Sequence, residues 1–388
     1  MGGGYSRSLV TPLRILFHVS YVTPDEPSPD PLGFVLSVLR QPVDDAILIV
    51  AAIVVLGLAI ALVRSPRSSR HWERFVRQAT TYRHFVPWML RLSAGLVLIG
   101  AGLGGYLFAP DLHLAGWPYF GFTVVGFLLL LGLAVRPAAL IALGGYALAM
   151  ILEPHVLLIA DVGGALAAIA LVGPGVPSLD DLLRAAFPRA PGAQAATTPP
   201  SQSRYDDLLP LTVRLGLGAA FLVSGIADKF LIYERSLEAV AKYHLTSVIP
   251  VDAGLWVVGA GLAEAALGVA ILLGFATRIS AIVAFAVLTL SLFALPDDAV
   301  VAHVALFGLC SVLVVLGAGR WSLDAWLERR RAAGGRPVVV DQIAKTSVPS
   351  IAPGRRRAMV TDAVRLSGCP APLRTPGTAV RRHGRRRP

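Results

Sequence analysis

A glutamate, Glu264, lies in a stretch of sequence that is otherwise apolar. The segment GLAEAALG, residues 261–268, is preceded by AGLWVVGA and followed by VAILLGF. A charge at the centre of a membrane-spanning helix costs about 3 kcal/mol on insertion scales, so such groups usually mark a pathway or a site. Gly261 and Gly268 share its helix face and admit a neighbouring helix or a flat ligand. We expect Glu264 to handle a proton there, or else to form a structural hydrogen bond.

Three further polar residues could complete a site with Glu264. Asp228 and Lys229 end an apolar stretch, and Lys229 could hold an anion or a quinone oxygen, pair with a nearby carboxylate, or reach the lipid headgroups. His303 lies in the outer third of the last apolar stretch, where it could bind a quinone carbonyl, relay a proton, or simply pack. The candidate ligand-binding residues are therefore Lys229, His303 and Asp228.

The sequence offers no redox centre of its own. A b-type haem between helices needs paired histidines within the membrane, and of the 8 histidines only His303 lies well inside an expected span. The two cysteines, Cys310 and Cys369, have neither a metal-binding spacing nor a disulfide framework. We expect no metal, no haem and no covalently bound cofactor. A partner chain would supply the redox centre of any electron transfer.

Membrane-spanning helices must position these residues. Of the 388 residues, 55% are hydrophobic and only 15% are charged. The uncharged stretch 46–63 is long enough to cross a bilayer. The sequence therefore predicts an all-α, polytopic integral membrane protein of about nine transmembrane helices. The expected spans are residues 46–63, 86–108, 117–135, 137–152, 156–173, 208–231, 254–276, 279–295 and 299–317.

Basic residues set the expected orientation, because Lys and Arg stay on the cytoplasmic side. The loop at residues 64–84 carries six arginines, and the other arginine-rich loops fall on the same side when nine spans alternate. We expect a multi-pass protein of the cell membrane with its N-terminus outside and its C-terminus in the cytoplasm. The net charge of +11 comes almost wholly from the tail after residue 331, so lipid is an expected partner and nucleic acid is not.

One four-helix unit occurs twice in the sequence. RLSAGLVLIGAGLGGYLF (91–108) aligns with RLGLGAAFLVSGIADKFL (214–231), and both units close on the pattern G-x-G-x-x-SLD or its near equivalent. An even number of spans in each unit makes the two copies parallel. Glu264 aligns with Phe122 in the first unit, which is therefore a degenerate copy without the carboxylate.

Arginines recur at equivalent places in both units, near the expected inner face. Because the degenerate copy keeps them, we expect them to anchor the topology and not to take part in catalysis. The residues expected to be structural are Arg91, Arg136, Arg214 and Arg278, together with the packing glycines Gly261 and Gly268.

The composition divides the chain into successive segments. These are an external N-terminal segment with the first span and a basic cytoplasmic loop (1–85), the first four-helix unit (86–184), a Pro/Ala/Ser linker (185–207), the second four-helix unit (208–331) and a basic, disordered tail (332–388). The tail could lie on anionic lipid or be an unselected reading of the gene's end, and no function is assigned to it.

Three motifs, in this order, resemble the DoxX/DoxD family of small four-helix membrane proteins. They are R-x-x-x-G-x-x-F-x-x-x-G-x-x-x-K-F at 214–230, E-x-x-x-G-x-x-x-L-L-G-x-x-T-R at 264–278 and G-x-G-x-x-SLD at 317–324. The resemblance covers about 208–327, with 86–183 as a degenerate tandem copy. It implies a membrane subunit of a redox complex, similar to the small DoxD subunit of thiosulfate:quinone oxidoreductase, or a partner of soluble antioxidant or sulfur-transfer enzymes.

These observations favour a membrane subunit that docks a redox partner chain and helps to pass electrons to quinone. Glu264 would handle the proton, and Lys229 or His303 would orient the ligand. Such a chain is an accessory subunit of an oxidoreductase and not a self-sufficient catalyst. The alternatives are a small-solute carrier with two parallel units around a central site, and an interaction scaffold without a site. Homo-oligomers are compatible with each alternative.

Overall fold

The computed structural model describes most of the helical body of the chain. The described residues are 27–64, 70–113, 118–186, 207–295 and 300–334. The chain divides into two compact parts, Met1–Gly334 and Gly335–Pro388. Every described residue, and hence both four-helix units, lies in Met1–Gly334. The expected linker (185–207) and the expected disordered tail (332–388) therefore fall almost wholly outside the described residues, as do residues 1–26.

The described N-terminal part begins with two helices and an amphipathic segment. Its elements are α2 (Pro31–Leu39), α3 (Pro42–Arg64), α4 (Arg70–Thr81) and the 3₁₀ turn η2 (Tyr82–Phe85). α3 is apolar on all sides and exposes its large side chains along its length, as a helix surrounded by lipid does. α4 carries arginines on one face and aromatic residues on the other, and it continues through η2 into the next span.

The first unit contains four apolar helices and a short hairpin. Its elements are α5 (Val86–Gly104), β1 (Tyr106–Leu107), β2 (Ala109–His113), α6 (Pro118–Leu131), α7 (Val135–Leu152), η3 (Pro154–Ile159), α8 (Ala160–Val172) and α9 (Leu179–Ala186). β1 and β2 pair in antiparallel fashion. The sequence did not predict this hairpin, which follows the left-handed glycine Gly105 at the end of α5.

The second unit repeats the order of four apolar helices and adds short helices between the first two. Its elements are α10 (Leu209–Ile226), the π-helical turn η4 (Ala227–Leu231), α11 (Tyr233–Lys242), α12 (Leu245–Val248), α13 (Ala253–Leu273), α14 (Thr277–Ala294), α15 (Val300–Leu316) and α16 (Leu323–Gly334). Each span of both units thus begins and ends within a few residues of its predicted bounds.

Apart from the short β1–β2 hairpin, the described part of the chain is helical, and the chain is a multi-pass membrane protein. Among the described residues, 7 helices are long and apolar enough to cross a membrane. They lie within 44–61, 70–104, 135–152, 154–172, 209–231, 253–273 and 277–294. Two shorter apolar helices, 119–131 and 303–316, occupy the places of the other two expected spans. The total of nine transmembrane helices stays a prediction.

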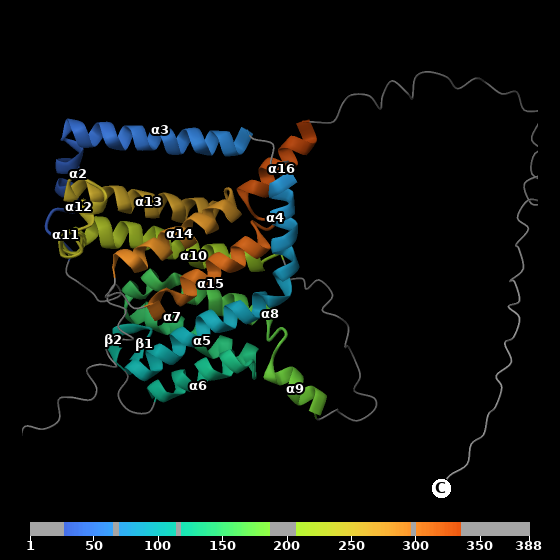
Figure 1. The fold of residues 1–388 in the computed structure, drawn as a ribbon. Helices are drawn as coiled ribbons and strands as arrows, with labels where there is room; N and C mark the ends of the chain where they lie inside the picture. Colours follow the sequence, from blue (N-terminus) through green and yellow to red (C-terminus); the bar gives the residue numbers. More distant parts are fainter. Residues whose placement is uncertain (1–26, 65–69, 114–117, 187–206, 296–299, 335–388) are drawn as a thin grey trace, which may run out of the picture. The chain divides into compact units, whose positions relative to one another are not determined.

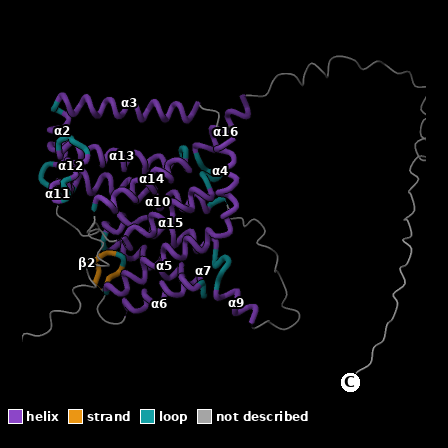
Figure 2. The backbone as a smooth tube through the Cα atoms, in the orientation of Figure 1, coloured by secondary structure: helices purple, strands orange, loops and turns teal. Residues whose placement is uncertain are grey.

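The two units interlock through their first and last helices. Within each unit the first helix packs along the second, which pairs α5 with α6 and α10 with α13. Across the units, α10 packs against α8 and α5 packs against α15, so these four helices lie together in the middle of the bundle (Figure 1; Figure 2). One hydrophobic core therefore runs through both units. The predicted tandem duplication would produce this reciprocal packing.

Glycines bring α10 and α13 into backbone contact. A Cβ atom added to Gly225 would lie 2.8 Å from the carbonyl oxygen of Gly261, and one added to Gly268 would lie 2.8 Å from the carbonyl oxygen of Gly218. Small residues at such positions allow helices to associate closely in lipid. Of the two occupants that the sequence allowed at Gly261 and Gly268, a neighbouring helix or a flat ligand, the structure places the helix α10 there.

Gly225→Ala should therefore destabilise the protein, because the added methyl group overlaps the backbone of α13 and the helices must separate. We expect a loss of about 1–3 kcal/mol in the free energy of unfolding, measured by thermal unfolding in detergent micelles. Gly259→Ala is the matched control on α13, since its Cβ would meet no described atom within 4 Å. The control should be neutral or slightly stabilising. Equal effects of the two substitutions would contradict the close contact.

A buried arginine holds the end of each unit. We call residues 317–324, with the SLD sequence, the closing loop of the second unit. Arg214 on α10 is 1% exposed and donates from Nη2 to the carbonyl oxygen of Trp321 in this loop. In the first unit, Arg91 on α5 is equally buried and donates to the carbonyl oxygen of Pro177. The two arginines thus tie the first helix of each unit to its last loop.

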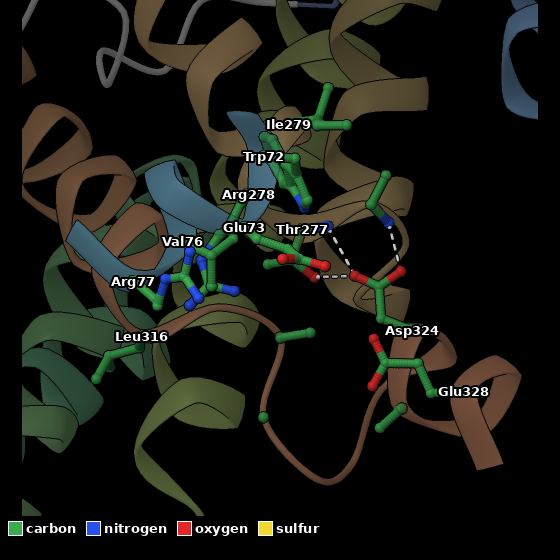
Figure 3. A pocket seen from close by; sticks show the side chains of 14 residues that line it. Trp72, Glu73, Val76, Arg77, Thr277, Arg278, Ile279, Leu316, Asp324 and Glu328 are labelled. Carbon is green, nitrogen blue, oxygen red and sulfur yellow. Dashed lines mark hydrogen bonds between the residues drawn. The ribbon is translucent and has the colours of Figure 1, made fainter. Parts of the chain in front are cut away.

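The aspartate of the closing loop caps the third helix of the second unit. Asp324 is buried, and its two carboxylate oxygens accept from the backbone N–H groups of Ala276 and Thr277, both at 2.9 Å (Figure 3). The Thr277 hydroxyl adds a third bond at 3.2 Å. In the first unit, Asp180 accepts one bond at 3.2 Å from the N–H of Ala134. The SLD motif is therefore a helix cap supplied from a distant part of the sequence.

Asp324→Ala should destabilise the protein more than Asp180→Ala does. The first substitution leaves two buried N–H groups without their acceptor, which costs about 1–3 kcal/mol for each unsatisfied group. The second removes a single, longer hydrogen bond at an exposed position. Unfolding temperatures of the two purified variants in the same detergent measure the difference. If the Asp180 variant loses as much stability as the Asp324 variant, the capping account of the closing loop is wrong.

Candidate functional site

The candidate site lies where α10 changes from an α-helix to a π-helical turn. In η4 the N–H of Ile232 donates to the carbonyl oxygen of Ala227 at 2.9 Å, five residues back. π-helical turns inside helices occur often at functional sites. This turn carries Asp228 and Lys229, two of the candidate residues. The extra residue in the turn presents both side chains near α13.

An ion pair joins this turn to α13. Lys229 Nζ lies 3.8 Å from Glu264 Oε2, and the two side chains are 21% and 25% exposed. Of the partners that the sequence allowed for Lys229, the structure therefore shows Glu264. Glu264 Oε2 is buried and accepts no hydrogen bond from the described residues, because the ammonium group is too far away for one. That oxygen remains available to a proton.

Asp228 is held beside the ion pair by serine residues. Ser224 Oγ, one turn earlier on α10, donates to Asp228 Oδ2 at 2.9 Å. Ser236 Oγ, on α11, donates to the backbone carbonyl oxygen of Asp228 at 2.7 Å. The polar cluster, defined as Ser224, Asp228, Lys229 and Glu264, thus combines two carboxylates, one ammonium group and one hydroxyl group.

Glycine contacts create the geometry of the polar cluster. A Cβ atom on Gly261 would lie 2.7 Å from the Cβ of Lys229 and 3.0 Å from the ring of Phe230. The η4 turn can therefore cross α13 only because residue 261 has no side chain. Glu264 follows one helical turn later, within reach of the lysine. The absence of a side chain at Gly261 thus allows the ion pair to form.

The polar cluster borders the surface that faces lipid. On α13 the side chain of Leu262 is 49% exposed, and on η4 that of Leu231 is 46% exposed. The Lys229 and Glu264 side chains are themselves partly exposed, at 21% and 25%. A lipid-soluble molecule can thus reach the cluster sideways from the bilayer. The sequence did not reveal the π-helical turn or the serines, although Ser224 stands four residues before Asp228, a spacing that brings side chains together on a helix.

His303 lies on α15 and is 8% exposed. This helix packs against α14, α5 and α10. The hydrogen bonds and the ion pair that define the polar cluster come from α10, η4, α11 and α13, so the cluster is defined without His303. Its role as a ligand-binding residue stays a prediction.

The arginines expected to be structural lie at the loop end of each unit. Arg214 and Arg91 bind the loops described above. Arg278 on α14 donates from Nε to the carbonyl oxygen of Val314 at 2.9 Å and from Nη2 to that of Val315 at 3.3 Å, at the end of α15. Arg136 lies against the equivalent glycine of the first unit, Gly173. These contacts fasten helix ends together.

Aromatic residues replace the polar cluster in the first unit. Phe122, which aligns with Glu264, packs edge-on against Phe108 at a ring-centroid distance of 5.5 Å. Phe108 packs in the same way against Tyr146, whose hydroxyl group donates to the carbonyl oxygen of Val156 at 3.2 Å. Any chemistry of a carboxylate at this position therefore belongs to the second unit alone.

The lysine and the glutamate should be coupled energetically. Lys229→Met leaves the Glu264 carboxylate without its cation, at a cost of about 1–3 kcal/mol in the free energy of unfolding. Adding Glu264→Gln to the same protein should recover part of this loss, because the unpaired charge is gone. The measurement is a double-mutant cycle of unfolding free energies in detergent. Lys242→Met, at an exposed lysine on α11, is the control and should change little. Zero coupling between the two sites would show that the ion pair does not form.

A comparison with known protein families gives a match that covers this site. Residues 209–303 match the family model described as DoxX. The matched segment contains α10, η4, α13 and α14 and hence the whole polar cluster, whereas the first unit lies outside it. No curated protein and no solved structure matches the chain. The similarity to a DoxD subunit and the duplication stay predictions. The match supports the DoxX family for this segment of a multi-pass membrane protein.

Proposed function

We propose that the second unit binds a quinone beside the Lys229–Glu264 ion pair, and that the chain is the membrane subunit of a quinone-linked redox complex. The observation that carries the proposal is the pair itself. An ammonium group and a carboxylate lie 3.8 Å apart at a π-helical turn, on the border of a lipid-facing surface. The DoxX match over the same residues adds the membrane-protein family.

The side chains suit the chemistry that quinone reduction requires. A quinone becomes a quinol by taking up two electrons and two protons. The Lys229 ammonium group can donate a hydrogen bond to a ligand carbonyl oxygen. Glu264 can hold a proton at Oε2, the oxygen without a hydrogen bond. Asp228 and Ser224, joined at 2.9 Å, can pass a proton toward the membrane surface. The electrons would come from a redox partner chain that docks on this subunit.

The proposal includes a place and an orientation for the chain. Arg74, Arg77 and Arg83, on α4 and η2, lie at one end of the span that begins at α5, where Arg329 and Arg330 on α16 also carry positive charge. The preference of basic residues for the cytoplasm puts this end inside a cell membrane. The N-terminus would then be outside and the C-terminus in the cytoplasm.

The alternatives predict a different distribution of polar groups. A carrier with two equivalent halves would need equivalent polar groups in both units, but the aromatic cluster of Phe108, Phe122 and Tyr146 occupies the place of Glu264 in the first unit, whose buried carboxylate, Asp161, lies elsewhere, on α8. An interaction scaffold would have no use for a glutamate oxygen that lies buried without a hydrogen bond. The quinone site accounts for both observations.

Glu264→Gln should weaken quinone binding and quinone-linked turnover together. The probe is decylubiquinone, titrated against the purified full-length protein in detergent, and we expect about tenfold weaker binding because the neutral amide no longer holds the Lys229 ammonium group in place for its charge-assisted bond to the quinone carbonyl oxygen. Glu238→Gln, at an exposed glutamate on α11, is the control and should bind as the unchanged protein does. A complex purified from native membranes with its copurifying partner then gives the turnover.

Two results would overturn the proposal. One is unchanged decylubiquinone binding and unchanged turnover in the Glu264→Gln complex. The other is copurification from the native membrane without any oxidoreductase chain or quinone, identified by mass spectrometry. In that case solute uptake into vesicles that contain the protein would test the carrier alternative.

A further inference from the structure

A pocket lies at the loop end of the second unit, away from the polar cluster. It has a volume of about 510 Å³ and is bounded by α4, the turn between α13 and α14, the end of α15 and α16 (Figure 3). About twelve residues of α13 and its following turn separate it from Glu264, a distance of roughly 18 Å along a helix. The pocket is therefore distinct from the polar cluster.

The pocket lies at the level of the membrane surface. α13 ends at Leu273, α14 begins at Thr277 and α15 ends at Leu316, so three apolar spans end around it. Trp321 and Trp326 are 60% and 42% exposed close to the same helix ends, and tryptophan collects at the boundary between lipid and water. The ligand that reaches this pocket most readily is thus the headgroup of a lipid.

The charges around the pocket are of both signs. Arg77 on α4 and Arg278 on α14 contribute two cations, and Glu73 and Glu328 contribute two carboxylates. Figure 3 shows the two arginines on one side of the view, with Glu328 on the opposite side. The carboxylate of Asp324 also lines the pocket, but it accepts the hydrogen bonds that cap α14. A simple anion would meet the glutamates, and a simple cation would meet the arginines.

Apolar side chains form the rest of the lining. They are Trp72, Val76, Ile279 and Leu316. Arg278 is held in place by its bonds to the carbonyl oxygens of Val314 and Val315, so its guanidinium group does not have to be ordered when a ligand binds. The pocket thus combines two arginines, one of them held rigidly, with two carboxylates and an apolar wall. Such a lining suits a zwitterionic molecule that also has an apolar part.

We propose that this pocket binds a phosphodiester that carries a primary amine, the headgroup chemistry of phosphatidylethanolamine. Arg77 and Arg278 bind the phosphate oxygens, for which the guanidinium group is well suited. Glu73 and Glu328 accept hydrogen bonds from the ammonium group. Val76 and Ile279 contact the glycerol and the first acyl carbons. Two sources share this chemistry, a membrane lipid and free glycerophosphoethanolamine.

Native mass spectrometry of the full-length protein tests the proposal. The protein is purified in a mild detergent and titrated with phosphatidylethanolamine or with phosphatidylglycerol, which has the phosphate but no amine. We expect the unchanged protein to retain the first lipid and to release the second at a lower collision energy. Arg77→Glu should weaken retention of phosphatidylethanolamine by about tenfold, the effect of losing a charge-assisted contact.

The matched control is Arg74→Glu, which makes the same charge reversal on the same helix outside the pocket lining. It should leave retention within about twofold of the unchanged protein, because Arg74 does not line the pocket and would not contact the phosphate. Equal losses in the Arg74 and Arg77 variants would reduce the effect to general surface charge and overturn the site. Equal retention of the two lipids would overturn the role of the glutamates.

Val76→Trp is a second, independent test in case the Arg77 variant does not fold. The larger side chain fills the pocket without changing its charge. An unchanged unfolding temperature with loss of the lipid supports the pocket as the binding site. An unchanged temperature with the lipid retained overturns it. Competition with free glycerophosphoethanolamine identifies the source. Displacement at equal concentrations indicates a soluble ligand, and resistance to displacement indicates a membrane lipid.

Discussion

The backbone contact between α10 and α13 is the constraint on which the site depends. In a bilayer no hydrophobic force drives helices together, because lipid tails are as apolar as the side chains. Association must come from close packing, and Gly218, Gly225, Gly261 and Gly268 provide it. The same contact lays the η4 turn across Gly261 and carries Lys229 to Glu264. The ion pair is thus a consequence of how the two helices pack. The attraction between the two charges is not needed to bring the helices together.

The first unit has a structural role even though it has no carboxylate at the position of Glu264. Its α8 packs against α10 and its α5 packs against α15, so the second unit has neighbours from the first on both of these helices. The core runs through both units without interruption. Gly164 meets Gly216 at one crossing, and Gly308 meets Ser93 at the other. The first unit can therefore carry the aromatic cluster around Phe122 in the place of a carboxylate and still complete the core.

Hydropathy and repetition revealed the spans, because an apolar stretch in this chain can only be a helix within lipid. The alignment of the units also placed the arginines and the SLD motif at equivalent helix ends. The hydropathy pattern does not show which helices pack against each other. The sequence alone therefore left open the partner of Lys229 and the group that packs against Gly261. The π-helical turn at Asp228 and the pocket beneath α4 depend on packing between distant segments, which no local spacing of residues encodes.

The helix that joins α4 to α5 fixes how deep the protein sits in its membrane. α4, η2 and α5 form one continuous helical segment, Arg70–Gly104, in which α4 carries Trp72, Phe75 and three arginines that prefer the headgroup level. No slack loop intervenes at η2, so α5 cannot slide along the membrane normal without pulling these residues from that level. Because α5 packs against α15, the vertical position of the whole bundle follows. Bilayer thickness then becomes a variable that tunes how much water reaches Lys229 and Glu264.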